Sequence, residues 1–276
     1  MRTPDSISHY ENFPVASFLL PAHLRGPVAA IYAFARSADD FADEGNLAAD
    51  ERLALLNGYR EELDRLAHDE PTRHPLFLRL RPVIACHALP LQLFRDLLDA
   101  FAQDVAHDRY ANFDELMDYC RRSANPVGRL LLHLFAAATP ENLKDSDAIC
   151  SALQLINHWQ DVGIDAGKGP RGRIYLPADD MANFGVSAES ILRRSTSAEF
   201  CALMHFEVER ARALMHSGAP LGRRLPGRIG MEIRAIIAGG LRILEKIEAV
   251  DYDVFNRRPT LKATDWPRLG LRALFP

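Results

Sequence analysis

The chain has 276 residues, of which 48% are hydrophobic and 25% charged, and its formal net charge is −4. This composition is typical of a folded globular protein, and the net negative charge argues against a nucleic-acid-binding protein, which usually carries a basic stripe. We therefore expect a single domain over residues 1–276 with small molecules, not nucleic acid, as partners.

Apolar residues recur every three to four positions along seven segments, a period typical of helices. The segments are residues 27–45, 49–66, 91–106, 113–138, 146–165, 198–217 and 226–250. Alternating strand patterns are nearly absent. Expected helix boundaries are Pro27 and Pro226 as first positions, Asn112 as a cap, and Gly45 and Gly167 just past the ends. The sequence predicts an all-α bundle with a central cavity between facing helices.

The first segment carries a polar stripe on an otherwise apolar helix. At about 100° per residue, Tyr32, Arg36, Asp39 and Asp43 fall on one face. The two carboxylates lie four residues apart and repel each other by about 0.2–0.5 kcal/mol unless a cation neutralises them. An exposed acidic helix end is the alternative, although acidic residues at a carboxyl-terminal end oppose the helix dipole. We expect this stripe to face an interior cavity.

The segment 146–165 repeats the arrangement. Its polar face holds short carboxylates and uncharged amides, and no Lys or Arg occurs between Lys144 and Lys168. A solvated face would normally carry Lys and Glu, so a simple amphipathic surface helix is the weaker interpretation. The residues of this face are Gln154, Asn157, Asp161 and Asp165.

Oxygen ligands of this kind suit Mg²⁺, which is typically held by one or two carboxylates together with substrate phosphates. A di-iron bundle is the rival, but it needs Glu-x-x-His on two helices, and no Glu in this chain is followed three residues later by His. Two acidic walls joined through Mg²⁺ would bind a diphosphate and assist its departure as a leaving group. The apolar part of the cavity would then receive the hydrocarbon carbocation.

Several segments resemble the squalene and phytoene synthase family, whose members act on isoprenyl diphosphates. The match spans most of the chain and includes residues 19–21, 31–43, 119–128, 157–165 and 173–177. Residues 9–17 and 119–128 resemble its bacterial branch that forms hydroxysqualene for hopanoid biosynthesis. The resemblance implies a Mg²⁺-dependent enzyme with an isoprenoid-synthase fold and no NADPH requirement.

The resemblance also implies roles for individual residues. Tyr119 matches a tyrosine beside the reacting carbons, where its ring would stabilise a carbocation. The implied Mg²⁺ ligands are Asp39, Asp40, Asp43, Asn157, Asp161 and Asp165, with Gln160 nearby. The implied substrate-binding residues are His9, Tyr10, Tyr32, Arg36, Asn125, Gln154, Asn157, Arg173, Tyr252 and Arg257, with Arg258 as a further candidate. His107, His133 and His158 are expected to be structural.

Two departures from the family pattern bear on the product. Where relatives usually carry Val-Ala-Gly or Val-Ala-Ser, this chain has residues 123–126, and Pro126 should kink the helix. That change could help to admit a water molecule. Tyr10 and Asn12 replace the hydroxyl residues that often follow His9, which puts a second substrate-diphosphate site in doubt. The basic loop 167–173 either closes over a diphosphate or is an ordinary surface loop.

The expected reaction is the conversion of presqualene diphosphate and water to hydroxysqualene and diphosphate. One alternative is the condensation of two prenyl diphosphates to presqualene diphosphate, squalene or phytoene. Another is a non-catalytic assembly factor of the same fold, for which eroded acidic motifs would be expected. Residues 1–11 lack the apolar run of a signal peptide, so we expect a cytoplasmic protein. Peripheral membrane contact and transient contact with other hopanoid-pathway enzymes stay open.

Overall fold

The computed structural model describes residues 20–169 and 171–274, and every regular element in these ranges is a helix. The predicted all-α class is confirmed. The helices are α1 (Ala22–Asp43), α2 (Ala49–Ala67), α3 (Pro75–His87), α4 (Leu91–Ala106), α5 (Phe113–Ser123), α6 (Asn125–Leu134), α7 (Pro140–Asp165), α8 (Ala178–Asn183), α9 (Ala188–Leu192), α10 (Ala198–Gly218), α11 (Leu221–Arg224), α12 (Gly227–Ala249), the 3-10 turn η1 (Ala263–Asp265) and α13 (Trp266–Leu274). The interpretation as one domain over residues 1–276 stays a prediction.

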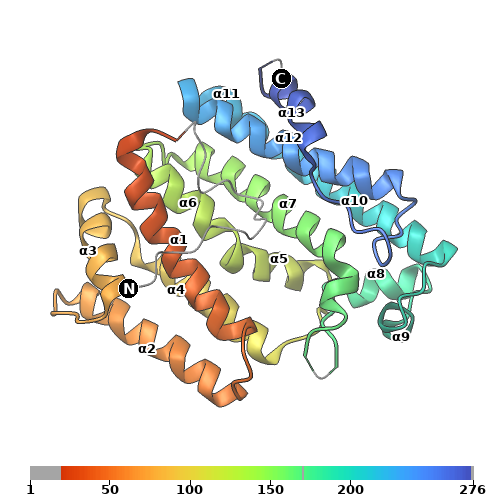
Figure 1. Ribbon diagram of the computed structural model, residues 1–276, viewed down its shortest axis with the longest axis horizontal. Helices are drawn as coiled ribbons and strands as arrows, with labels where there is room; N and C mark the ends of the chain where they lie inside the picture. Colours follow the sequence, from red (N-terminus) through yellow and green to blue (C-terminus); the bar gives the residue numbers. More distant parts are fainter. Residues whose placement is uncertain (1–19, 170, 275–276) are drawn as a thin grey trace.

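Helix α7 runs through the middle of the molecule and packs against α5, α6, α10 and α12 (Figure 1). Helix α1 packs against α2, α3, α4 and α6 on the other side of the bundle. Each group has its own hydrophobic cluster, one centred on α7 and α10 and the other on α1 to α4. The two polar helix faces therefore belong to different halves of the bundle.

The predicted boundaries needed correction at both proline positions. Helix α1 begins at Ala22, so Pro27 is its sixth residue, beyond the four N–H groups that a helix start leaves unpaired, and its missing N–H removes one hydrogen bond to the preceding turn. Pro226 is the residue before α12 and not its first position, because Gly227 already starts the helix. The cap at Asn112 is confirmed, since its side chain accepts a hydrogen bond from the Glu115 N–H at 2.9 Å.

The predicted helix over residues 113–138 is divided into α5 and α6. The division lies at Ala124, whose φ of −113° departs from the helical value. Pro126 has no N–H to donate to the preceding turn, and it occupies the first turn of α6, the position that a helix tolerates best. The expected kink is therefore confirmed as a complete break, and it lies one turn after Tyr119.

Close packing around α12 depends on Gly240. A Cβ at this position would lie 2.8 Å from Met215 Cε and 3.1 Å from Leu153 Cδ2.

Within residues 20–169 and 171–274, no helix is long and apolar enough to cross a membrane.

Candidate active site

A cavity of about 500 Å³ lies between the two halves of the bundle. Both predicted polar faces line it, with Tyr32, Arg36, Asp39 and Asp43 from α1 and Gln154, Asn157, Asp161 and Asp165 from α7. The acidic residues belong to the last two turns of their helices. The apolar part of the lining comes mainly from earlier α1 and from α6 and α12: Val28, Ile31, Val127, Leu131, Phe135, Ile233 and Ile236. The cavity is thus acidic where α1 and α7 end and apolar elsewhere.

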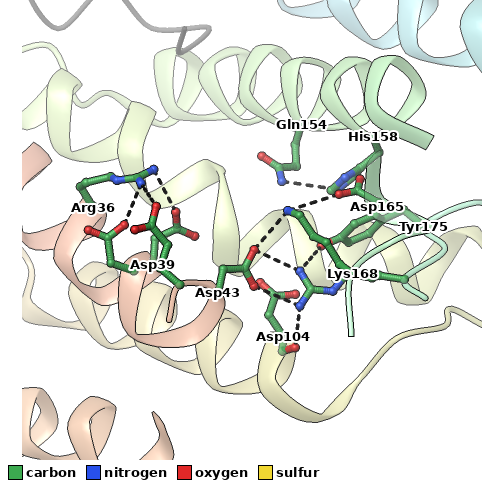
Figure 2. A network of polar contacts seen from close by, with 12 residues as sticks. Arg36, Asp39, Asp43, Asp104, Gln154, His158, Asp165, Lys168 and Tyr175 are labelled. Carbon is green, nitrogen blue, oxygen red and sulfur yellow. Dashed lines mark hydrogen bonds and ion pairs between the residues drawn. The ribbon is translucent and has the colours of Figure 1, made fainter. Parts of the chain in front are cut away.

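Basic side chains neutralise the acidic residues in this conformation. Lys168 lies between the two acidic helix ends, with its ammonium 3.2 Å from Asp43 and 3.3 Å from Asp165 (Figure 2). Arg173 also pairs with Asp43, at 3.1 Å. On α7, Arg258 donates to Asp161 Oδ2 at 3.1 Å. These cations offset the cost of placing carboxylates at helix carboxyl ends, about 0.3–1 kcal/mol each.

The protonation of the carboxylates follows from burial and these neighbours. Burial and the charge of Asp43 raise the pKa of Asp39 to about 6. Burial also raises the pKa of Asp165 to about 6, although Lys168 opposes the rise. For Asp43, burial acts in the same direction, but Arg173 and Lys168 outweigh it and hold its pKa below the ordinary value. The site thus has carboxylates that a cation would convert fully to the charged form.

The carboxylates that line the cavity suit Mg²⁺ as pairs and not as a larger cluster. Among the residues that the structure describes, no three His, Cys, Asp or Glu side chains lie close enough together to hold one ion. Mg²⁺ keeps several waters and commonly uses one or two carboxylates with substrate phosphates, so pairs of carboxylates on facing walls fit it. The pairs available are Asp39 with Asp43 and Asp161 with Asp165.

Next to the acidic end, Tyr119 is hydrogen-bonded to Asp104, an acid that the sequence analysis did not single out. Tyr119 donates its hydroxyl to Asp104 Oδ2 at 2.8 Å, and both residues line the cavity. Burial raises the pKa of Asp104 to about 7, although Arg173 and the Tyr119 hydrogen bond oppose the rise. Asp104 continues the buried stripe of Leu97, Ala100 and Phe101 on α4. An acid on an apolar stripe was the signal that could have identified it.

His158, expected to be structural, also lines the cavity. Its ring stacks on Tyr175 with centroids 3.6 Å apart and planes at 15°. Burial, together with Lys168 and Arg173, lowers its pKa to about 3, so the imidazole is neutral. Its Nε2 lies 3.4 Å from the Gln154 amide nitrogen (Figure 2). Gln154, a predicted substrate-binding residue of α7, therefore lies against the stacked rings of His158 and Tyr175.

The loop after α7 is fastened to the α4–α5 connection through backbone atoms. Arg109 donates to the carbonyl of Arg171 at 3.0 Å and also to that of Gly172. The Ile174 N–H donates to the Asp108 carbonyl at 3.0 Å. Lys168 and Arg173 of this loop line the cavity, and closure of the loop over a diphosphate stays a prediction.

Four predicted residues are not among the cavity lining. Asn125 lies between α6 and α7 and accepts a hydrogen bond from Ser151 at 2.8 Å. Asp40 faces Arg36, 2.8 Å away. Tyr252 hydrogen bonds His205 at 2.9 Å, and Arg257 pairs with Asp253 at 3.4 Å. Asn125, Tyr252 and Arg257 are thus engaged away from the acidic end, whereas Asp40 lies beside it through its pair with Arg36. His9 and Tyr10 lie outside the described residues.

Residues 8–265 match the family described as squalene/phytoene synthase. The chain belongs to the squalene/phytoene synthase family. A hydroxysqualene synthase from Zymomonas mobilis is 37% identical over 82% of this chain and 75% of its own length. A phytoene synthase from Arthrospira platensis is 31% identical over 91% and 85%. The crystal structure of squalene synthase HpnC from Alicyclobacillus acidocaldarius has a TM-score of 0.81 at 39% identity, covering 89% of this chain and 90% of that one.

Family membership confirms the fold and the expectation of an enzyme. The roles of individual side chains in binding a metal or a substrate stay predictions. Five of the ten predicted substrate-binding positions line the cavity: Tyr32, Arg36, Gln154, Asn157 and Arg173.

Proposed function

We propose that this chain is a Mg²⁺-dependent hydroxysqualene synthase that converts presqualene diphosphate and water to hydroxysqualene and diphosphate. The observation that carries the proposal is one cavity with facing acidic walls where α1 and α7 end and an apolar lining elsewhere. A diphosphate ester of a long hydrocarbon has the same two parts. A relative named hydroxysqualene synthase at 37% identity, against 31% for a phytoene synthase, favours this branch of the family.

The acidic end would bind the diphosphate through metal and side-chain cations together. Asp39, Asp43, Asp161 and Asp165 would hold Mg²⁺, which would neutralise charge on the departing diphosphate. Lys168 and the arginines that line the cavity add positive charge from the protein itself: Arg36, Arg173 and Arg258. Guanidinium groups suit phosphate oxygens because they donate two parallel hydrogen bonds.

The remaining lining would protect and shape the carbocation. Tyr119 and Tyr175 present aromatic rings near the acidic end, and ring faces attract a cation by about 0.5–2 kcal/mol. Their hydroxyls are engaged, since Tyr119 donates to Asp104 and Arg173 donates to Tyr175 at 3.3 Å. The apolar side chains of α6 and α12 would hold the hydrocarbon and exclude bulk water.

The direct test is incubation of the purified protein with Mg²⁺ and presqualene diphosphate, followed by lipid analysis. Hydroxysqualene is the expected product, whereas squalene or unchanged substrate would contradict the proposal. Farnesyl diphosphate supplied alone separates a condensing enzyme from one that requires presqualene diphosphate. NADPH is expected to have no effect on the product.

A matched pair of variants tests the role of the acidic walls. Asp161→Asn is expected to lower turnover by about 10²-fold or more, because a carboxylate that binds the metal is lost. Asp118→Asn is the control, since Asp118 is paired with Arg121 at 2.8 Å outside the cavity lining and should leave turnover nearly unchanged. Equal turnover in both variants would contradict a metal-binding role for Asp161.

Location and partners remain part of the proposal. We expect the enzyme to act in the cytoplasm and to rest on a membrane when it releases its insoluble product. Trp266 and Leu271 of α13 are 62% and 61% exposed and are the apolar side chains to test. Flotation with liposomes would measure this contact, and co-purification would measure transient contact with other hopanoid-pathway enzymes.

A further inference from the structure

Two buried side-chain oxygens in the cavity lining have no hydrogen-bond partner among the residues that the structure describes. They are Asp104 Oδ1 and Ser123 Oγ. Buried polar atoms are paired in more than about nine cases in ten, and ordered water commonly supplies the missing partner. Two such atoms in one cavity are therefore the features of a water-binding site.

Tyr119 is hydrogen-bonded to Asp104 and lies on the same helix face as Ser123. Its hydroxyl donates to Asp104 Oδ2 at 2.8 Å, which fixes that carboxylate and leaves Oδ1 as the second oxygen. Ser123 follows Tyr119 by four residues on α5, so both side chains lie on the same helix face. Ser123 is also the last residue of α5, immediately before the break at Ala124.

Resting on the function proposed above, we propose that Asp104 Oδ1 and Ser123 Oγ hold the water molecule that captures the carbocation, and that Asp104 accepts the proton of that water. When the diphosphate leaves with the electron pair of its carbon–oxygen bond, the rearranged cation accepts a lone pair from the water oxygen. The O–H electron pair stays with that oxygen as the proton passes to Asp104. The products are the alcohol, diphosphate and neutral Asp104, which then returns the proton to solvent.

Other groups at the cavity are less suited to this role. Asp43 and Asp165 are already bound by the Lys168 ammonium, and His158 Nε2 lies against Gln154. Tyr119 uses its proton in the bond to Asp104. Asp104 is only 9% exposed, and its raised pKa, about 7, is near the value at which a carboxylate is an effective general base at neutral pH.

The test compares two substitutions at the site with two controls elsewhere. Asp104→Asn keeps an oxygen for Tyr119 but cannot accept the proton, and Ser123→Ala removes one ligand of the water. Asp145→Asn is the matched acid control, because Asp145 is also 9% exposed but is paired with Arg224 outside the cavity lining. Ser37→Ala is the matched hydroxyl control, since Ser37 hydrogen bonds Tyr59 at 2.8 Å.

Each variant is incubated with presqualene diphosphate, Mg²⁺ and ¹⁸O-labelled water, and two quantities are measured. One is the rate of diphosphate release, which reports ionisation; the other is the ratio of ¹⁸O-labelled alcohol to hydrocarbon products, which reports capture. We expect Asp104→Asn to lower the ratio by about 10²-fold and Ser123→Ala by about tenfold, while release falls much less. Both controls should keep the wild-type ratio.

Parallel losses of release and capture in Asp104→Asn, with an unchanged ratio, would show that Asp104 is only structural. If Asp104→Asn does not fold, an unchanged ratio in Ser123→Ala would overturn the water site. A wild-type protein that releases diphosphate but forms no alcohol would instead refute the proposed function, so the two failures are distinguishable.

Discussion

Removing the charge of Asp165 should stabilise the metal-free protein while it damages the proposed metal site. The side chain is 9% exposed, and burial raises its pKa from 3.8 to about 6. A raised pKa means that the folded protein holds a proton that the unfolded chain has already released. The folded state therefore loses stability as the pH rises from about 4 to 6, and the whole cost is present above that range.

The size of this cost follows from the shift. About two pKa units at about 1.4 kcal/mol each correspond to about 3 kcal/mol, which already includes the attraction of Lys168. For a domain of this size, Asp165→Asn should raise the melting temperature by up to roughly 6–10 °C at pH 8. At pH 4 the carboxyl of Asp165 is protonated in the folded state, and the gain should disappear.

The assay is thermal or denaturant unfolding in EDTA at pH 8 and at pH 4. Asp265→Asn supplies a control of opposite sign, because Lys246 and Arg242 outweigh burial and hold the pKa of Asp265 well below its ordinary value. That variant should lose stability at pH 8. A destabilised Asp165→Asn at pH 8, or a gain that does not change with pH, would refute the reasoning.

Two further outcomes are expected. Without substrate, Lys168→Met should lower the Mg²⁺ concentration needed for half-maximal thermal stabilisation by about fivefold. The reason is that the two partly exposed ion pairs of Lys168 with Asp43 and Asp165 compete with the metal. An unchanged concentration would show that the ammonium does not compete. Gly240→Val should destabilise the folded protein by about 1–3 kcal/mol, because the added side chain would meet Met215. Gly239→Ala has its nearest contact at 3.7 Å and should stabilise the folded protein by up to about 1 kcal/mol. Denaturant titrations that reverse this order would contradict the packing argument.

The two polar faces could be predicted because they are local properties of a helix. A rotation of about 100° per residue places Asp39 with Asp43 and Asp161 with Asp165 whatever surrounds them. The bond that ties Tyr119 to Asp104 joins different helices, so no local pattern contains it. The same holds for Lys168, whose position between the two walls depends on a loop anchored by a distant arginine.

Tyr252 lies in a turn that no local sequence pattern predicts. Helix α12 ends at Ala249, and the backbone then takes positive φ values of 53° at Asp251 and 61° at Tyr252. Left-handed conformations are uncommon outside glycine, so nothing in the residue types predicts this turn. It places the Tyr252 hydroxyl against His205. The short helices α8, α9 and α11 escaped prediction for a simpler reason, since four to six residues contain too little periodicity.

The attachment of loop 167–173 has a consequence for sequence variation. Arg109 reaches the loop through the carbonyls of Arg171 and Gly172, and a backbone carbonyl is present whatever the side chain. The side chain at position 171 should therefore vary freely among homologues, provided that Arg109 and the loop length are kept, whereas Lys168 and Arg173 line the cavity and a Cβ at Gly172 would clash with the Ala166 carbonyl. An insertion or deletion between α7 and Arg173 would shift every anchored carbonyl at once, so variation in length should be far rarer here than variation in residue type.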